Sequence, residues 1–198
     1  MNIFYLDNDP VKSAELHCDK HVVKMIIEYA QLMSTAHRVL DGELYEDRTA
    51  NNRRIKRWRL GDSNMENVLY KASHINHPSN IWIRSSDSHY QFVYDMFVAL
   101  CNEYTHRYGR VHLTEEKLKD ILQHLPNSIA STDFVDPPQA MPDDVKTTDA
   151  VTAYQNYYRM YKAGFAKWTN RVTPSFMKNI LGKNSVSKYN IVSEDSYV

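Results

Sequence analysis

The chain has 198 residues, of which 42% are hydrophobic, and its 24 basic and 24 acidic residues give a formal net charge of +0. This length fits one domain or two small ones, and the composition is typical of a soluble globular protein. With only five glycines, the chain is neither collagen-like nor a Gly/Ser linker. The balanced charge excludes a protein that is basic throughout, although it allows a local basic patch.

Neither a membrane nor an oxidising compartment is expected. The sequence has no run of about 18 apolar residues, so no spanning helix and no membrane partner are predicted. The N-terminal residues MNIFYLDNDP lack the basic and then apolar pattern of a secretory signal. Cys18 and Cys101 are too few for a disulfide scaffold. We therefore expect two small core residues and a cytoplasmic protein.

The first half of the chain predicts helices. Asp9 and Pro10 suit a helix start, and the next glycine after them is Gly42. The run 11–40 is thus one long helix, or two with a bend early on. Residues 43–63 are polar and predict a surface excursion, and 64–71 predict a short helix. His77-Pro78 then begins a helix that runs to Arg107 and ends at Gly109.

The second half predicts further helices and one long loop. Thr114 starts a short helix that ends near Leu125. Residues 126–146 hold four of the seven prolines and predict an ordered loop or flap. Asp149 caps a last long helix, 150–167, and a polar tail follows residue 174. Since no repeat, βαβ alternation or Gly-rich phosphate loop is found, we predict a single compact all-α domain over 1–198, built on three long helices with long ordered loops.

The first helix carries the most distinctive pattern. At about 100° per residue, a continuous helix places His17, His21, Lys24 and Glu28 on one narrow stripe between apolar flanks. A solvated helix face is normally wider and mixed in Lys and Glu. The stripe therefore predicts a polar groove in which burial and nearby charges shift pKa values. The alternative is a satisfied buried network.

Three chemistries suit this stripe. Glu28 beside a cation or a histidine can act as a general acid or base, and Lys24 can become a nucleophilic amine. His17 and His21 could share a metal, but the segment between them lacks the glutamate of the zinc-protease helix, and nearby lysines oppose a cation. We predict no metal and no cofactor.

Three further segments are binding candidates. Residues 73–84 place histidine, asparagine and arginine around a helix start, which suits either an anion site or a capping turn. The proline-rich residues 137–146 form a rigid loop or a packed connection. The stretch 53–59 has five basic residues and can follow phosphates or form a solvated surface. The candidate substrate- or DNA-binding residues are His74, His77, Asn80, Arg84, Arg53, Arg54, Arg57, Gln139 and Lys146.

Several short motifs resemble one family. Asp19-Lys20-His21, Glu28 seven residues after that histidine, and Val39-Leu40-Asp41-Gly42 resemble the pyrimidine-dimer DNA glycosylase/AP-lyase family. His77-Pro78 and Tyr157-Tyr158 are similar to further segments of that family. The resemblance covers about a third of the chain, in patches.

The resemblance implies a small, all-α, metal-independent protein whose partner is damaged double-stranded DNA. It implies that an N-terminal α-amine attacks C1′ of a flipped nucleotide while a glutamate, here Glu28, assists. His21 matches the histidine of the family. The bulky Asn2 favours retention of the initiator, so the amine would belong to Met1.

Two other classes remain open. The chain could be a nucleotide- or nucleoside-processing enzyme that uses the same groove, which its neutral charge favours. It could also be a non-catalytic interaction protein in which the stripe is a buried network. A steep salt dependence of DNA binding distinguishes the repair enzyme from both.

Overall fold

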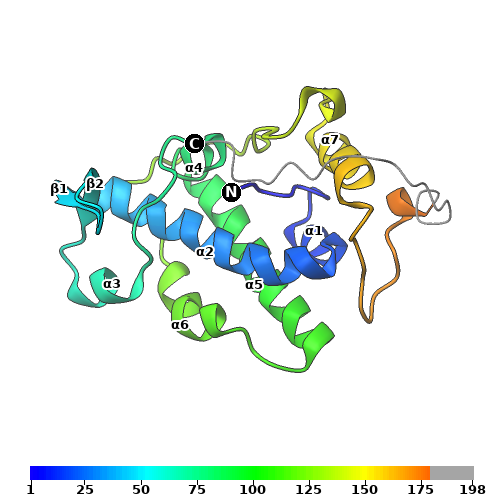
Figure 1. Ribbon diagram of the computed structural model, residues 1–198, viewed down its shortest axis with the longest axis horizontal. Helices are drawn as coiled ribbons and strands as arrows, with labels where there is room; N and C mark the ends of the chain where they lie inside the picture. The colour runs from blue at the N-terminus through cyan, green and yellow to red at the C-terminus, as the bar shows by residue number, and fades with distance from the viewer. Residues whose placement is uncertain (179–198) are drawn as a thin grey trace.

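A computed structural model describes residues 1–178 of the chain (Figure 1). The helices of this part are α1 (Pro10–Leu16), α2 (Asp19–Asp41), α3 (Ser63–Val68), α4 (Pro78–Ile83), α5 (Asp87–Tyr108), α6 (Leu113–Leu122) and α7 (Ala150–Tyr157). A π-helical turn, Tyr158–Lys162, continues α7, and short 3-10 turns occur at Asp143–Val145 and Ser175–Met177. None of the described helices is long and apolar enough to cross a membrane.

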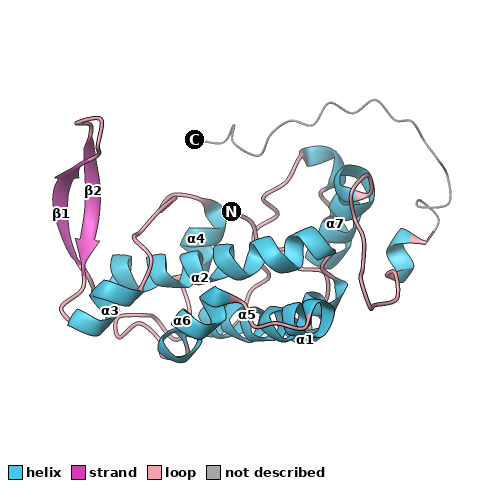
Figure 2. Cartoon of the chain, turned by 60° about the horizontal axis from the view of Figure 1, so that its bottom comes forward, coloured by secondary structure: helices cyan, strands magenta, loops and turns pink. Residues whose placement is uncertain are grey.

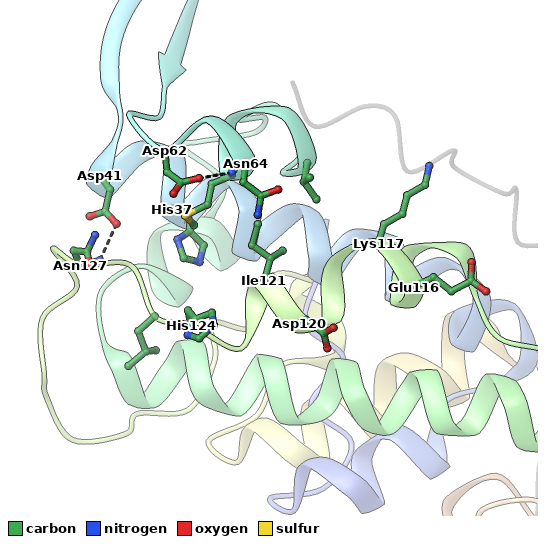
Figure 3. Close-up of a pocket in the computed structure, with 13 residues that line it drawn as sticks. His37, Asp41, Asp62, Asn64, Glu116, Lys117, Asp120, Ile121, His124 and Asn127 are labelled. Atoms are coloured by element: carbon green, nitrogen blue, oxygen red, sulfur yellow. Dashed lines mark hydrogen bonds between the residues drawn. The ribbon is translucent and has the colours of Figure 1, made fainter.

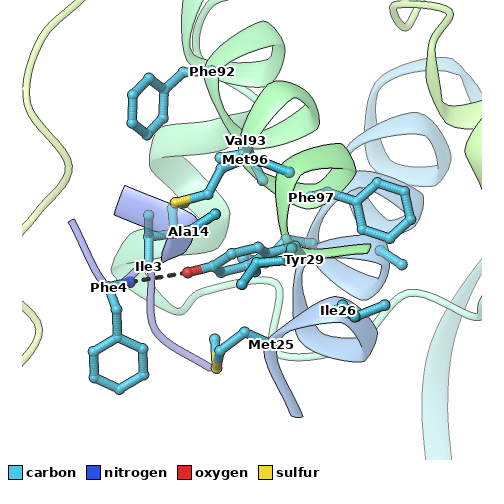
Figure 4. Close-up of a cluster of buried hydrophobic side chains, with 14 of the residues drawn as sticks. Ile3, Phe4, Ala14, Met25, Ile26, Tyr29, Phe92, Val93, Met96 and Phe97 are labelled. Atoms are coloured by element: carbon cyan, nitrogen blue, oxygen red, sulfur yellow. Dashed lines mark hydrogen bonds between the residues drawn. The ribbon is translucent and has the colours of Figure 1, made fainter. Parts of the chain in front are cut away.

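The core forms where α2 crosses α5. Both helices also contact α6, and α1 packs against α5 (Figure 1). Ile26 and Tyr29 of α2 are fully buried, as are Met96 and Phe97 of α5 (Figure 4). The N-terminal segment lies against this core, with Ile3 fully buried. Both cysteines are buried and free, as predicted.

The mainly helical class is confirmed, but three long helices are not found. Within residues 1–178 only α2 and α5 exceed 20 residues. The expected helix 150–167 is α-helical only to Tyr157 before it widens to the π-helical turn. The expected helix 80–107 is interrupted between α4 and α5, where Ser86 caps α5 through its side chain. No proline or glycine marks that interruption in the sequence.

The run 11–40 forms two helices. Asp9 caps α1 as predicted, and α1 ends at Leu16 before α2 begins at Asp19, which agrees with the second of the two predicted alternatives. The side chain of Arg107, buried on α5, holds the junction by donating to the backbone oxygens of Glu15 and His17 and to the carboxylate of Asp19. This contact comes from 90 residues away in sequence, and no local signal shows it.

Residues 43–59 correct the all-α prediction. They form an antiparallel hairpin of β1 (Glu43–Arg48) and β2 (Arg54–Arg59), which projects from one end of the helical body (Figure 2). Gly42 permits the sharp exit from α2, because a Cβ there would collide with the Arg38 carbonyl and lie 3.1 Å from Trp58 Cβ. The prediction of a surface excursion is correct in position, whereas its secondary structure was missed.

The predicted loop 126–146 is ordered. The Trp82 indole donates to the Val135 oxygen, and the Val135 amide donates to His89. The only regular element within this loop is the 3-10 turn at Asp143–Val145. Part of the predicted polar tail, residues 179–198, lies outside the described residues.

Candidate active site

His17 does not lie on the predicted stripe, because it ends α1 and α2 has not yet begun. Its Nδ1 donates to the Ser13 carbonyl at 2.7 Å, so the Tyr29 hydroxyl donates to its Nε2 at 3.2 Å. That hydroxyl in turn accepts the Phe4 amide at 3.1 Å (Figure 4). Burial lowers the pKa of His17 to about 4. His17 is thus a neutral, hydrogen-bonded core residue, as the alternative interpretation proposed.

His21 is also buried, in an aromatic cluster. Its Nδ1 lies 2.5 Å from the Tyr158 hydroxyl, and its ring stacks on Phe4 with 4.3 Å between centroids. The Lys162 ammonium lies over the rings of Phe4 and Tyr157, at 5.9 and 4.6 Å from their centroids. The cluster joins the N-terminal segment, α2 and the end of α7. Tyr154 and Tyr158 are fully buried in it, whereas Tyr161 is 41% exposed.

Glu28 lies further along α2, at the edge of the core. Its side chain is 16% exposed and forms an ion pair of 3.2 Å with Lys24, which is 50% exposed. One turn further, Gln31 donates to the Ser73 hydroxyl at 2.7 Å. This middle part of α2 therefore presents a carboxylate at the surface, unlike the closed network at its start.

The amino terminus is held in a defined position. The Asn2 amide donates to the Ala140 carbonyl at 2.8 Å, and its Oδ1 accepts the Ile3 amide and the Tyr154 hydroxyl. In both overall views the terminus lies beside α4 and over α2 (Figures 1 and 2). Met1 directly precedes this anchor, so its position is restricted by the hydrogen bonds of Asn2. The sequence drew attention to Asn2 only through its effect on Met1 retention.

His77 lies near that terminus and caps α4. Its Nδ1 accepts the Ser79 amide at 3.2 Å, so in the neutral ring Nε2 carries the proton. Burial, followed by the positive charges of the Met1 ammonium and His74, lowers the pKa of His77 to about 4. Near pH 7, His77 is therefore a neutral hydrogen-bond donor close to the α-amine.

The other residues of the 73–84 segment fix its conformation. His74 has a left-handed backbone with φ of 48°. Asn80 is fully buried and donates to the carbonyls of Ser73 and His74. Arg84 donates to the Ile75 carbonyl at 2.7 Å. Asn80 and Arg84 thus serve the capping turn, which was one of the two interpretations of this segment.

The remaining predicted binding residues are spread over the molecule. The Gln139 amide is used within its own loop, where it donates to and accepts from the Thr147 backbone. Lys146 forms an ion pair of 2.7 Å with Asp143. Arg53, Arg54 and Arg57 lie on the projecting hairpin. Met1 and His74 thus lie close enough to His77 to affect its pKa, whereas the arginines belong to the separate hairpin.

Two of the surface pockets lie away from the predicted site residues. One, of about 500 Å³, lies between the end of α2, α3 and α6 and is lined by residues that include His37, Asp41, Asp62, Asp120 and His124 (Figure 3). The other, of about 570 Å³, lies between α1 and α5. Neither contains a predicted site residue. The predicted site residues therefore lie outside both of these pockets.

Comparison with known proteins assigns no family. No protein-family model matches the chain, and no curated protein or solved structure shows significant similarity to it. Residues 1–178 contain no group of three or more His, Cys, Asp or Glu side chains arranged to hold a metal ion.

Proposed function

We propose that the protein is a DNA glycosylase/AP lyase that processes damaged sites in duplex DNA through the α-amine of Met1, assisted by Glu28. The observation that carries this proposal is the fixed amino terminus. Asn2 makes three hydrogen bonds that hold it, and the terminus lies over α2 beside neutral His77. α-Amines have reference pKa values of about 7.7–8.0, so a useful fraction of such groups is nucleophilic at neutral pH.

The reaction at an abasic site needs only water and groups that the chain carries. The neutral amine adds to the C1′ aldehyde of the opened sugar, and loss of water gives an imine. A base removes a proton from C2′, the 3′ phosphate leaves, and water regenerates the amine. We assign the proton transfers to Glu28 and a hydrogen bond to the sugar or a phosphate to the Nε2–H of His77.

The neutral state of His77 supports this assignment. If His77 were protonated, its positive charge would repel the iminium that forms on the amine and would destabilise it. With its pKa lowered to about 4, His77 adds no such charge at neutral pH. Lys24, paired with Glu28, orients the carboxylate in this account.

Borohydride trapping on an abasic duplex tests the proposal, since the reagent reduces an imine to a stable secondary amine. We expect a covalent adduct with the unmodified protein and none with an Nα-acetylated form. Glu28→Gln should lower the rate of adduct formation by about 10²- to 10⁴-fold. The control is Glu116→Gln, which replaces an exposed carboxylate on α6 and should leave the rate unchanged.

An adduct that forms equally well on the acetylated protein would contradict the role of Met1. Equal rates for Glu28→Gln and the control would contradict the role of Glu28. The absence of any adduct, together with no salt-sensitive binding of duplex DNA, would favour a nucleotide- or nucleoside-processing enzyme instead.

A further inference from the structure

The hairpin of residues 43–59, here called the basic arm, is built unlike the rest of the molecule. Most of its side chains are exposed on both faces of the two-stranded sheet. An isolated two-stranded hairpin gains little stability in water. The arm therefore has the form of an appendage whose side chains are available to a partner.

Positive charge is concentrated on this arm although the chain as a whole is neutral. The arm contains the acidic residues Glu43, Glu46 and Asp47 and the basic residues Arg48, Arg53, Arg54, Lys56, Arg57 and Arg59. In the part of the chain that the structure describes, none of these basic side chains forms an ion pair. The surplus of three positive charges is thus not neutralised by the protein itself.

The strand register concentrates the surplus positive charge near the tip of the basic arm. Arg48 lies directly opposite Arg54, and Arg53 directly precedes Arg54 in the turn. Like charges at directly opposed positions destabilise a strand pair. On the same face Glu46 opposes Lys56, so only part of the charge is balanced. An anionic partner would remove the repulsion between the two arginines.

The dimensions and charge point to one partner. The major groove of B-form DNA is about 12 Å wide and admits a two-stranded β-ribbon. Six residues per strand extend about 20 Å at about 3.4 Å per residue. We propose that the basic arm enters the major groove of duplex DNA and contacts its phosphates, and so provides most of the affinity for DNA.

The base of the arm is fixed, which gives the complex a defined spacing. The buried Arg38 donates to the Trp58 carbonyl at 3.0 Å, so β2 is tied to α2. From Tyr29, which holds the N-terminal segment, to the exit at Gly42 the helix rises by about 20 Å. At 3.4 Å per base pair, this corresponds to about six base pairs. The arm would therefore contact DNA about six base pairs or more from the site at the amino terminus, a statement that rests on the proposed function.

Fluorescence anisotropy with an undamaged 20-base-pair duplex tests the arm independently of any chemistry. The test variant Arg53→Ser/Arg54→Ser/Lys56→Ser removes three exposed cations from the arm. The matched control Lys12→Ser/Lys117→Ser/Lys167→Ser removes three exposed cations from the helical body. A second control, Arg53→Lys/Arg54→Lys/Lys56→Arg, keeps the charge of the arm.

We expect the test variant to bind at least tenfold more weakly and both controls to bind within about twofold of the unmodified protein. The slope of log affinity against log salt concentration, which is negative, should become shallower by up to about 2.7, since each lost phosphate contact contributes about 0.9. Equal affinities of the test variant and the body control would overturn the proposal. Binding of duplex RNA or anionic vesicles as strong as that of duplex DNA would also overturn it.

A second readout separates this inference from the proposed function. Cyanoborohydride trapping of the small aldehyde 2-deoxyribose 5-phosphate needs the amine but not the arm, so the test variant should form this adduct at the unmodified rate. If no protein forms an adduct while the arm variant alone loses duplex binding, the arm proposal stands and the lyase proposal fails. If the adduct forms and the affinity for duplex DNA does not depend on the arm, the lyase proposal stands and the arm proposal fails.

Discussion

The two ends of one predicted stripe have different surroundings. At the end of α1, just before α2 begins, both ring nitrogens of His17 form hydrogen bonds and the ring is fully buried. In the middle of α2, Glu28 is partly exposed and is paired with the exposed Lys24. Residue types that suggest chemistry thus occur in both places, but only the second is open to a substrate. The difference teaches that burial with complete hydrogen bonding distinguishes a structural histidine from a candidate site.

The largest stability effect in this comparison is expected for Arg107→Ala. The guanidinium is buried, is paired with Glu103 and Asp19, and holds the α1–α2 junction. Removal of one partner of a buried ion pair costs about 3–5 kcal/mol. Urea unfolding measures this loss, with the exposed Arg110→Ala as the control. A loss below about 1 kcal/mol would show that the junction does not depend on Arg107.

The second-largest effect is expected from acid, which should lower the free energy of unfolding by protonating buried histidines. Burial lowers the pKa of both His17 and His37 to about 4, against an ordinary value of about 6.5 in the unfolded chain. Because the unfolded state binds these protons first, stability is fully present above about pH 6.5 and falls as the pH decreases towards 4. Each residue contributes a loss of about 3 kcal/mol over this range, at 1.36 kcal/mol per pKa unit.

Denaturant unfolding at pH 7 and pH 4.5 checks this prediction. His17→Gln should reduce the pH dependence, whereas the exposed His106→Gln should leave it unchanged. A free energy of unfolding that is constant between these pH values would show that the buried histidines are not held neutral.

The smallest of the three effects is expected for Tyr29→Phe. The substitution leaves the buried Phe4 amide and His17 Nε2 without their shared partner. A buried polar group that loses its partner costs about 1–3 kcal/mol, so we expect a destabilisation of about 2 kcal/mol. Thermal unfolding measures it beside Tyr108→Phe, an exposed hydroxyl whose loss should cost little. Equal effects of the two substitutions would argue against the closed network.

Local signals predicted much of the fold. Asp9, Pro10, Asp149 and Gly109 mark helix ends that the structure confirms, because each acts on its own backbone. A bend early in the run 11–40 was one of two predicted alternatives, but its position could not be predicted from local signals, since Arg107 fixes it from α5. The hairpin was missed because its strands carry alternating charges on two exposed faces and so lack an apolar period.

The candidate site was predictable only in part. The residue types at Glu28, Met1 and His77 drew attention in the sequence, while the closeness of the Met1 ammonium to His77 did not. Asn2 reaches Ala140 and Tyr154 across about 140 residues, a contact that no spacing rule reveals. The predicted stripe is wrong at His17, because the prediction assumed a continuous helix through residue 18.

Peptide mapping of the borohydride-reduced adduct identifies the nucleophile on which the proposed reaction depends. After trapping on an abasic duplex and digestion, mass spectrometry locates the added sugar fragment. We expect the fragment on the α-nitrogen of Met1, and at the same site in Lys24→Arg. A fragment on the side chain of Lys24 or Lys162 would contradict the account and move the reaction to a lysine.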